Sequence, residues 1–261
     1  MLEPLHPRLT DILEIARQRG RVNVDLLSGR FGVTPQTIRK DLNDLCERQL
    51  LQRIHGGAVY PSSVANFAYD ARRSLAADGK QLIGTAAANL IPDNSSLIIN
   101  IGTTTEQVAL ALRRHKGLMV ITNNINVASI LLDVPSAEVV IAGGVVRHAD
   151  GGIMGEATVD FMRMFKVDYA VIGASAIDHD GEILDYDLRE VKVSQTIISN
   201  SRKTILVADS LKFERTAPVK IADFNMIDVF VTDNVPPASI VNICTAHNIE
   251  LVVANRNAAS V

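Results

Sequence analysis

The chain has 261 residues, 47% of them hydrophobic, which is enough for one large domain and one small domain and excludes a wholly disordered chain. No apolar run approaches the roughly 20 residues that a membrane-spanning helix needs, so we expect a cytoplasmic protein without membrane contacts. Only Cys46 and Cys244 are present, which excludes a disulfide framework, and the net charge of −3 argues weakly against a nucleic-acid binder.

The charge is unevenly distributed along the chain. Residues 1–60 carry 9 Lys and Arg against 7 Asp and Glu, whereas residues 61–261 carry 17 against 22. The N-terminal segment is therefore the basic end. An ordinary solvated surface can produce so small an excess of basic residues. Whether this segment binds nucleic acid must therefore be judged from the arrangement of its residues.

Residues 1–60 predict three helices and a hairpin. An apolar stripe at residues 9–16 indicates the first helix, and Asn23 can cap a short second one. Thr34 can cap the third helix, with Pro35 at its first position, where the missing N–H would have no partner in any case. The short connections give the spacing of a helix-turn-helix.

The third predicted helix has two different faces. Ile38, Leu42 and Leu45 fall at helical spacing and can face a core. The polar residues near its start are those that bind base edges and phosphates: Thr34, Gln36, Thr37, Arg39 and Lys40. The alternative is a small helical subdomain with a solvated outer face.

The stretch LLQRIHGGAVY, residues 50–60, follows the third helix. Its paired glycines suit the positive φ of a tight hairpin turn. The sequence therefore predicts a wing that brings Arg53 and His55 near the DNA backbone. Residues 61–78 show no helix or strand period, so we expect a linker there between domains at 1–60 and 79–261.

Beyond the linker, the pattern is that of an α/β domain. Strand-like apolar runs occur at residues 96–101, 118–123, 138–144, 168–174, 204–209 and 228–233. They alternate with amphipathic stretches at residues 80–90, 105–112 and 190–199. This alternation predicts a largely parallel sheet covered by helices, with ligands bound beyond the carboxyl ends of the strands.

Three polar or glycine-rich loops follow successive predicted strands. The first contains Gly102, Thr103, Thr104 and Thr105 and opens a helix, so it can offer N–H groups and hydroxyls to an anion. The others contain Asn123 and, further along, Gly143, Gly144 and Arg147. Each alone is ordinary turn chemistry. Their recurrence at successive strand ends favours a ligand that carries a phosphate.

Carboxylates and amines follow later strands. Asp187, Glu190 and Lys192 lie at a loop–helix junction, and Lys212 follows the strand at 204–209. Such groups can transfer protons on a sugar or can bind hydroxyls and phosphate, and the sequence leaves both open. The six histidines are scattered without ligand spacing, so we expect neither a metal nor a cofactor.

The stretch TPQTIRKDLNDLCERQLLQRIHGGA resembles the N-terminal signature of the DeoR family of bacterial repressors. NIGTTTE, TNN, AGG, DGGIMGEAT, REVK and ADSLKF extend the resemblance over nearly the whole chain. It implies a winged helix-turn-helix and a C-terminal domain that is similar to ribose-5-phosphate isomerase and CoA transferases and senses a sugar phosphate.

The resemblance also implies roles for residues. Residues 102–105 and Lys212 would hold the phosphate, and the rest of the pocket would be lined by Asn123, Arg147, Asp187, Glu190 and Lys192. Within the family, these motifs favour glycerol-3-phosphate as the effector. The sequence departs from the family pattern at Asn100, where many relatives have aspartate, and at Ser194-Gln195, which replace a basic pair.

We therefore expect a transcriptional repressor without enzymatic activity. Its partners would be double-stranded operator DNA, a phosphorylated small molecule that releases it, and further copies of the chain in a dimer or tetramer. The alternative is a sugar-phosphate isomerase or transferase with an accessory N-terminal domain. The basic recognition helix and its wing favour the repressor, because an isomerase does not need them.

Overall fold

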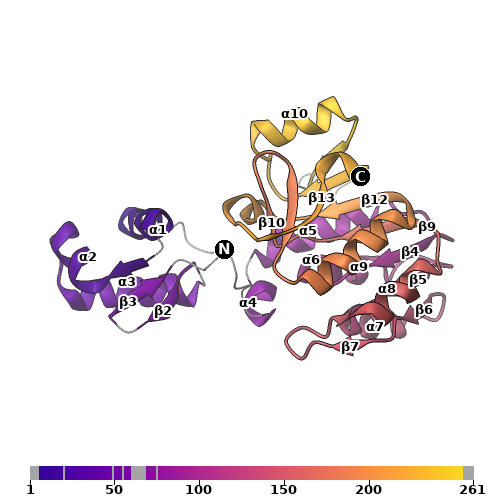
Figure 1. Cartoon of the computed structure of the whole chain (residues 1–261), viewed down its shortest axis with the longest axis horizontal. Helices are drawn as coiled ribbons and strands as arrows, with labels where there is room; N and C mark the ends of the chain where they lie inside the picture. The colour runs from indigo at the N-terminus through magenta and orange to yellow at the C-terminus, as the bar shows by residue number, and fades with distance from the viewer. Residues whose placement is uncertain are drawn as a thin grey trace. The chain divides into compact units, whose positions relative to one another are not determined.

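The computed structural model describes residues 6–19, 21–48, 50–54, 56–59, 69–74 and 76–254. The chain divides into an N-terminal unit and a C-terminal unit, with the division between Ala71 and Arg72 (Figure 1). Within the described ranges, no helix combines the length and the apolar character that crossing a membrane requires.

The N-terminal unit consists of helices around a small sheet. Its elements are α1 (Pro7–Arg19), β1 (Arg21–Asn23), α2 (Val24–Phe31), α3 (Pro35–Glu47), β2 (Gln52–Ile54) and β3 (Gly57–Val59). Both predicted caps are present, because Asn23 accepts a hydrogen bond from the N–H of Asp25 and Thr34 accepts one from the N–H of Thr37. Ile38 and its apolar neighbours on α3 are fully buried in one core. The predicted helix-turn-helix is confirmed.

The predicted hairpin is also present, as β2 pairs antiparallel with β3. Its two glycines act differently from the prediction, since only Gly56 has a positive φ, of 76°. Gly57 instead lets β3 approach β1, because a Cβ there would lie 2.0 Å from the carbonyl oxygen of Val22. The sequence does not predict β1, whose three residues are too few to display a strand period.

A seven-stranded sheet of order β15-β14-β12-β9-β4-β5-β6 lies at the centre of the C-terminal unit. Its strands are β4 (Ser96–Ile99), β5 (Met119–Thr122), β6 (Glu138–Ile141), β9 (Val167–Ile172), β12 (Ser201–Val207), β14 (Val229–Thr232) and β15 (Glu250–Val253). All neighbouring strands pair in parallel, which confirms the predicted sheet. The prediction omitted β15.

Helices cover both faces of this sheet (Figure 1). One layer contains α5 (Ala77–Ala88), α6 (Thr103–Leu112) and α7 (Ile125–Leu132), and the other contains α8 (Glu156–Arg163), α9 (Leu188–Ser199) and α10 (Ala238–Ala246). Successive residues of β4 point to opposite faces, so Leu97 and Ile99 join the first core and Ile98 joins the second. The buried strands are therefore apolar without alternation.

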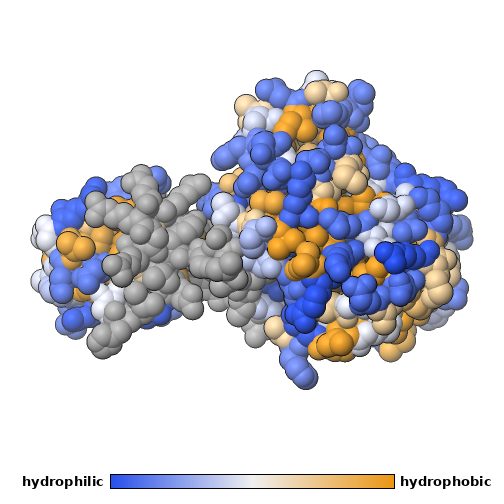
Figure 2. Space-filling view, viewed as in Figure 1, coloured by the Kyte–Doolittle hydropathy of each residue, from blue (hydrophilic) through white to orange (hydrophobic). Residues whose placement is uncertain are grey.

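Short elements complete the C-terminal unit. They are β7 (Val145–Val146), β8 (Ile153–Met154), β10 (Ala176–Ile177), β11 (Glu182–Asp185), β13 (Val219–Asp223) and the 3₁₀ turns η1 (Ser210–Glu214) and η2 (Phe224–Met226). A further helix, α4 (Tyr69–Ser74), lies in the segment for which the sequence predicts no helix, because six residues cannot establish a helical period. Figure 2 shows apolar areas interspersed with hydrophilic ones on one face.

The order of the strands reverses between β4 and β9. From β4 the chain proceeds outward through β5 to β6, and from β9 it proceeds outward through β12 and β14 to β15. The loops that leave β4 and β9 at their carboxyl ends therefore separate, and open parallel sheets form ligand crevices at such a point.

Candidate functional site

The polar face of α3 is open to solvent. Gln36, Arg39 and Lys40 are exposed, and Thr37 is half-buried with its hydroxyl 2.9 Å from that of Thr34. Arg53 is exposed on β2. The remaining predicted DNA contact, His55, lies outside the described residues.

Ion pairs neutralise two of the three acidic residues of α3, Asp41 and Asp44. Arg8 donates to both carboxylate oxygens of Asp41, at 2.6 and 3.1 Å, and Arg48 donates to Asp44 at 2.6 Å. Arg39 and Lys40 form no ion pair within the described ranges. The first turns of α3 therefore carry net positive charge toward solvent, which suits a polyanion.

In the C-terminal unit, a cavity lies at the reversal between β4 and β9. The loop after β4 contributes Gly102, Thr103 and Thr104, and the loop after β9 contributes Gly173 to Ser175. The rest of the wall includes Arg72 of α4, Asp185 of β11, Glu190 and Ser194 of α9, and Lys212 of η1. The structure thus brings five of the predicted effector residues to one cavity: Gly102, Thr103, Thr104, Glu190 and Lys212.

One part of the wall is suited to an anion. The helix α6 begins at Thr103, and its first N–H groups lack partners inside the helix. Gly102 has a φ of 153°, a conformation that side chains rarely adopt. The Thr105 hydroxyl is directed inward instead, since it donates to the carbonyl oxygens of Asn100 and Gly102, both at 2.8 Å, so we assign it a structural role.

Cations gather beside this helix start. Burial lowers the pKa of Lys212 to about 7, Asp209 opposes this shift, and Arg215, Lys80 and Arg72 add to it. Lys80 is itself buried, with its Nζ 3.4 Å from Asp209 and 2.9 Å from the carbonyl oxygen of Arg72. Positive charge therefore exceeds negative charge at this corner of the cavity. No local pattern in the sequence marks Arg72 or Lys80 as a residue of this site.

Carboxylates and hydroxyls form another part of the wall. Asp185 accepts a hydrogen bond from Ser175 at 3.0 Å. Glu190 accepts one from Arg147 at 2.7 Å, but its burial dominates and, together with Asp185, raises the pKa of Glu190 to about 8. Arg147 also binds Asp150, so this arginine supports Glu190 without lining the cavity itself. These groups suit the hydroxyls of a polyol.

The two positions that depart from the family pattern are in contact with each other. Asn100 donates a hydrogen bond to the hydroxyl of Ser194 at 2.7 Å, and both residues are buried. Ser194 lies one helical turn after Glu190 on α9 and reaches the same cavity. A neutral hydrogen-bonded pair therefore occupies these two positions, and Ser194 is its member in the cavity wall.

The structure does not bring the other predicted residues to the cavity. Lys192 is half-exposed and binds Glu156 at 3.0 Å in a groove between α8 and α9, because two residues along a helix turn it about 200° away from Glu190. Asn123 is fully buried and donates to the carbonyl oxygen of Ile153. Asp187 caps α9. The carbonyl oxygen of Gly143 accepts a hydrogen bond from the Thr158 hydroxyl, and Gly144 packs against the same side chain.

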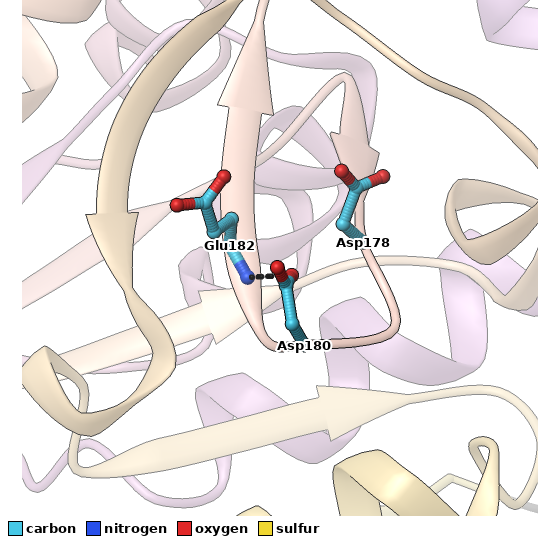
Figure 3. Close-up of side chains that lie close together, drawn as sticks. All are labelled: Asp178, Asp180 and Glu182. Atoms are coloured by element: carbon cyan, nitrogen blue, oxygen red, sulfur yellow. Dashed lines mark hydrogen bonds between the residues drawn. The ribbon is translucent and has the colours of Figure 1, made fainter.

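One group of carboxylates has metal-ligand geometry among the described residues. Oxygen atoms of Asp178, Asp180 and Glu182, on the β10–β11 hairpin, lie within 4.8 Å of one another (Figure 3). Asp180 accepts from the backbone N–H of Glu182 at 3.3 Å, and Lys220 binds the Glu182 carboxylate at 2.8 Å. Asp180 and Glu182 thus have partners in the hairpin and on β13, and we assign no metal to the group.

Both units match known protein families. Residues 8–64 match the DeoR-like helix-turn-helix domain, and residues 75–234 match the DeoR C terminal sensor domain. The chain is 43% identical to the glycerol-3-phosphate regulon repressor of Escherichia coli (strain K12), over 94% of this chain and 97% of that one. It is 44% identical to the protein of the same name in Haemophilus influenzae, over 94% and 95%.

Among solved structures, ribose 5 phosphate isomerase A from Neisseria gonorrhoeae is similar with a TM-score of 0.37 and 16% identity, over 57% of this chain and 56% of that one. The sequence relatives are transcriptional repressors and match over almost their full length. With a helix-turn-helix whose outer face is basic and a sensor domain that holds a cavity at its switch point, the chain belongs to the DeoR family of transcriptional regulators.

Proposed function

We propose that this protein represses transcription by binding an operator in double-stranded DNA and that glycerol-3-phosphate releases it. The observation that carries the proposal is the cavity at the switch point, where a helix start and a buried lysine, Lys212, lie in the same wall as Asp185 and Glu190. A phosphate suits the first set, and hydroxyls suit the second. The printed names of the relatives support this effector.

The DNA contacts are proposed for the polar face of α3. Gln36 and Thr37 would bond base edges, and Arg39 and Lys40 would bond phosphates or bases. Arg53, and His55 beyond the described residues, would contact the backbone from the wing. We also propose a symmetric dimer or tetramer, because one small module cannot supply the specificity that a genome demands. Half-sites would then lie about 10 bp apart or at a multiple of it.

The effector contacts are proposed for a narrower set than the sequence suggests. The N–H groups at residues 102–104 and the amine of Lys212 would hold the phosphate. Ser175, Asp185 and Glu190 would bond the hydroxyls. Glycerol should bind weakly, because it carries no phosphate for the Lys212 amine. A ligand with a second acidic group should also bind weakly, because that group would lie near the Asp185 carboxylate.

We further propose that the cavity does not turn its ligand over. Lys212 and Glu190 have pKa values near neutrality, which acid–base catalysis would use. A sensor, however, functions by holding its ligand unchanged, and a shared fold does not carry a shared chemistry. Incubation with glycerol-3-phosphate and ribose-5-phosphate, followed by product analysis, tests this. A conversion that disappears in Glu190→Gln would support the enzyme alternative.

The central experiment measures binding to the promoter beside the chain's own gene, by fluorescence anisotropy, with and without effector. Glycerol-3-phosphate should weaken operator binding by roughly 5- to 150-fold, the usual range of coupling between two sites. Glycerol and inorganic phosphate, at equal concentration, are the controls. Equal effects of glycerol and glycerol-3-phosphate would contradict the proposed phosphate site, and light scattering of the same samples tests the oligomer.

A further inference from the structure

The short helix α4 contacts the cavity through one residue, Arg72, by its side chain and by its backbone. Arg72 lines the cavity wall next to Thr103 and Lys212. Its carbonyl oxygen accepts hydrogen bonds from Lys80 at 2.9 Å and from the Thr103 hydroxyl at 3.5 Å. The division between the two units falls inside this helix, immediately before Arg72. The cavity is therefore connected directly to the segment through which the chain passes from one unit to the other.

The present partner of Arg72 is already well supplied with donors. The guanidinium of Arg72 lies 3.1 Å from one carboxylate oxygen of Asp150. Asp150 also receives two hydrogen bonds from Arg147, at 2.8 and 2.5 Å, and one from the N–H of Gly152 at 3.2 Å. Two arginines thus share one buried carboxylate, and Asp150 keeps a bidentate partner if Arg72 turns to another anion.

A phosphate in the cavity would compete for two of the contacts of Arg72 on α4, the ion pair with Asp150 and the hydrogen bond from the Thr103 hydroxyl. A dianion beside Thr103 and Lys212 offers Arg72 an acceptor other than the carboxylate that it shares with Arg147. The Thr103 hydroxyl has a single proton, so donating it to the phosphate ends its contact with the carbonyl oxygen of Arg72. Both changes act on α4, and both depend on the phosphate rather than on the hydroxyl end of the ligand.

We propose that Arg72 is a second cationic ligand of the effector's phosphate, beside Lys212. When the phosphate binds Arg72, helix α4 transmits the occupancy of the cavity to the N-terminal unit. The inference rests on the proposed function, since it concerns the same effector and the same release from DNA. In this proposal Arg72 binds the effector and also links its binding to operator release. Lys212 lies on η1, far from Arg72 in the sequence, and only binds the effector.

The test uses the full chain and compares Arg72→Ala with Arg73→Ala. Arg73 is the next residue of the same helix and is exposed, so it matches Arg72 in charge and helix position but not in contact with the cavity. Calorimetry gives the affinity for glycerol-3-phosphate. Anisotropy gives the operator affinity without effector and at saturating effector, and the ratio of these two affinities measures the coupling.

Arg72→Ala should weaken glycerol-3-phosphate binding by about 10- to 150-fold, as expected for a lost charge-assisted hydrogen bond. At saturating effector its coupling ratio should fall close to 1, while operator affinity without effector stays unchanged, which also shows that the variant folds. Hydrogen exchange at residues 69–74 should slow on effector binding in the natural chain and in Arg73→Ala, but not in Arg72→Ala.

Several outcomes would overturn the inference. They are a coupling ratio that is unchanged in Arg72→Ala, a coupling ratio that falls equally in Arg73→Ala, or a hydrogen-exchange rate at residues 69–74 that does not change when the effector binds. Failure of the proposed function has a different signature, because the natural chain itself would then not bind glycerol-3-phosphate or not leave the operator. Arg72→Lys provides a second variant. It keeps the charge, so it should recover part of the effector affinity without the full coupling ratio.

Discussion

The two units present positive charge to anions in opposite ways. On α3, Arg39 and Lys40 lie in water, and the nearby acidic residues are held by other arginines. At the cavity, Lys212 in the wall and Lys80 behind it are buried, and both interact with the carboxylate of Asp209. Exposed cations are hydrated and are screened by salt. Buried cations escape screening, but burial lowers their pKa and makes the loss of a partner costly.

The largest effect should come from removing the buried amine. Lys212→Met should cost about 3–5 kcal/mol of glycerol-3-phosphate binding, because the phosphate would enter a desolvated site without its counter-charge. Operator binding without effector should not change, so the variant behaves as a repressor that is not released. Calorimetry and anisotropy measure the two quantities. Lys192→Met, at an exposed lysine outside the cavity, is the matched control and should bind the effector normally.

Removing an exposed cation should have a smaller effect that depends on salt. Arg39→Ala should weaken operator binding by about 1–3 kcal/mol if Arg39 bonds a base, and should reduce the slope of log affinity against log salt by about 0.9 if it bonds a phosphate. Arg163→Ala, at an exposed arginine of the C-terminal unit, is the control. If Arg39→Ala changes neither the affinity nor the slope, α3 does not lie in the groove.

The lowered pKa of Lys212 predicts that effector binding depends on pH. The amine has a pKa of about 7 in the empty cavity, and a bound phosphate should raise it. Effector affinity should therefore be greatest between about pH 6, above which a phosphate ester is a dianion, and pH 7. Above pH 7 it should fall by up to about tenfold per pH unit, or roughly 1.4 kcal/mol, until the pKa of the bound state is reached.

Calorimetry in Tris and HEPES buffers between pH 7 and 8.5 measures this effect as proton uptake on binding. Glu190 also titrates near this range, with a pKa of about 8, so the same titration in Glu190→Gln separates the two groups. Binding without proton uptake in both proteins would show that Lys212 is already charged before the effector arrives.

The smallest effect should concern the ion pair that neutralises Asp41. Its members are only partly buried, with side-chain exposures of 28% for Arg8 and 12% for Asp41. A double-mutant cycle with Arg8→Ala and Asp41→Ala should give a coupling of about 1 kcal/mol in the free energy of unfolding. The Arg163–Asp160 pair, whose side chains are 62% and 70% exposed, should give nearly zero.

The sequence predicts elements that have a clear local pattern. The three helices of the N-terminal unit show a helical period, and caps such as Thr34 fix where helices start. Six of the seven central strands are continuous apolar runs. It does not predict α4 or β1, whose six and three residues are too short. For the cavity, the loop at residues 102–104 was predicted because a helix start after a buried strand has a local signature.

The rest of the cavity depends on long-range packing. Arg72 reaches the wall from a helix that no local pattern indicates. Lys192 was grouped with Glu190 by sequence proximity, although helical geometry favours Ser194 as the neighbour of Glu190. Asn123 is polar and follows a strand, as predicted, yet its amide hydrogen-bonds the backbone in the interior. The residue types therefore indicated the kind of ligand site, but the sequence did not show which side chains point into the cavity.

The pairing of β4 with β9 has a consequence for the order of folding during synthesis. Leu97 pairs with Tyr169, and the Asp168 carboxylate binds Ser96 across 72 residues of chain. The core of the N-terminal unit, by contrast, needs only residues between Leu9 and Ala58. Pairings between distant segments form slowly, and N-terminal domains fold first on the ribosome. A nascent chain therefore completes its recognition helix well before the sheet that creates the cavity can close.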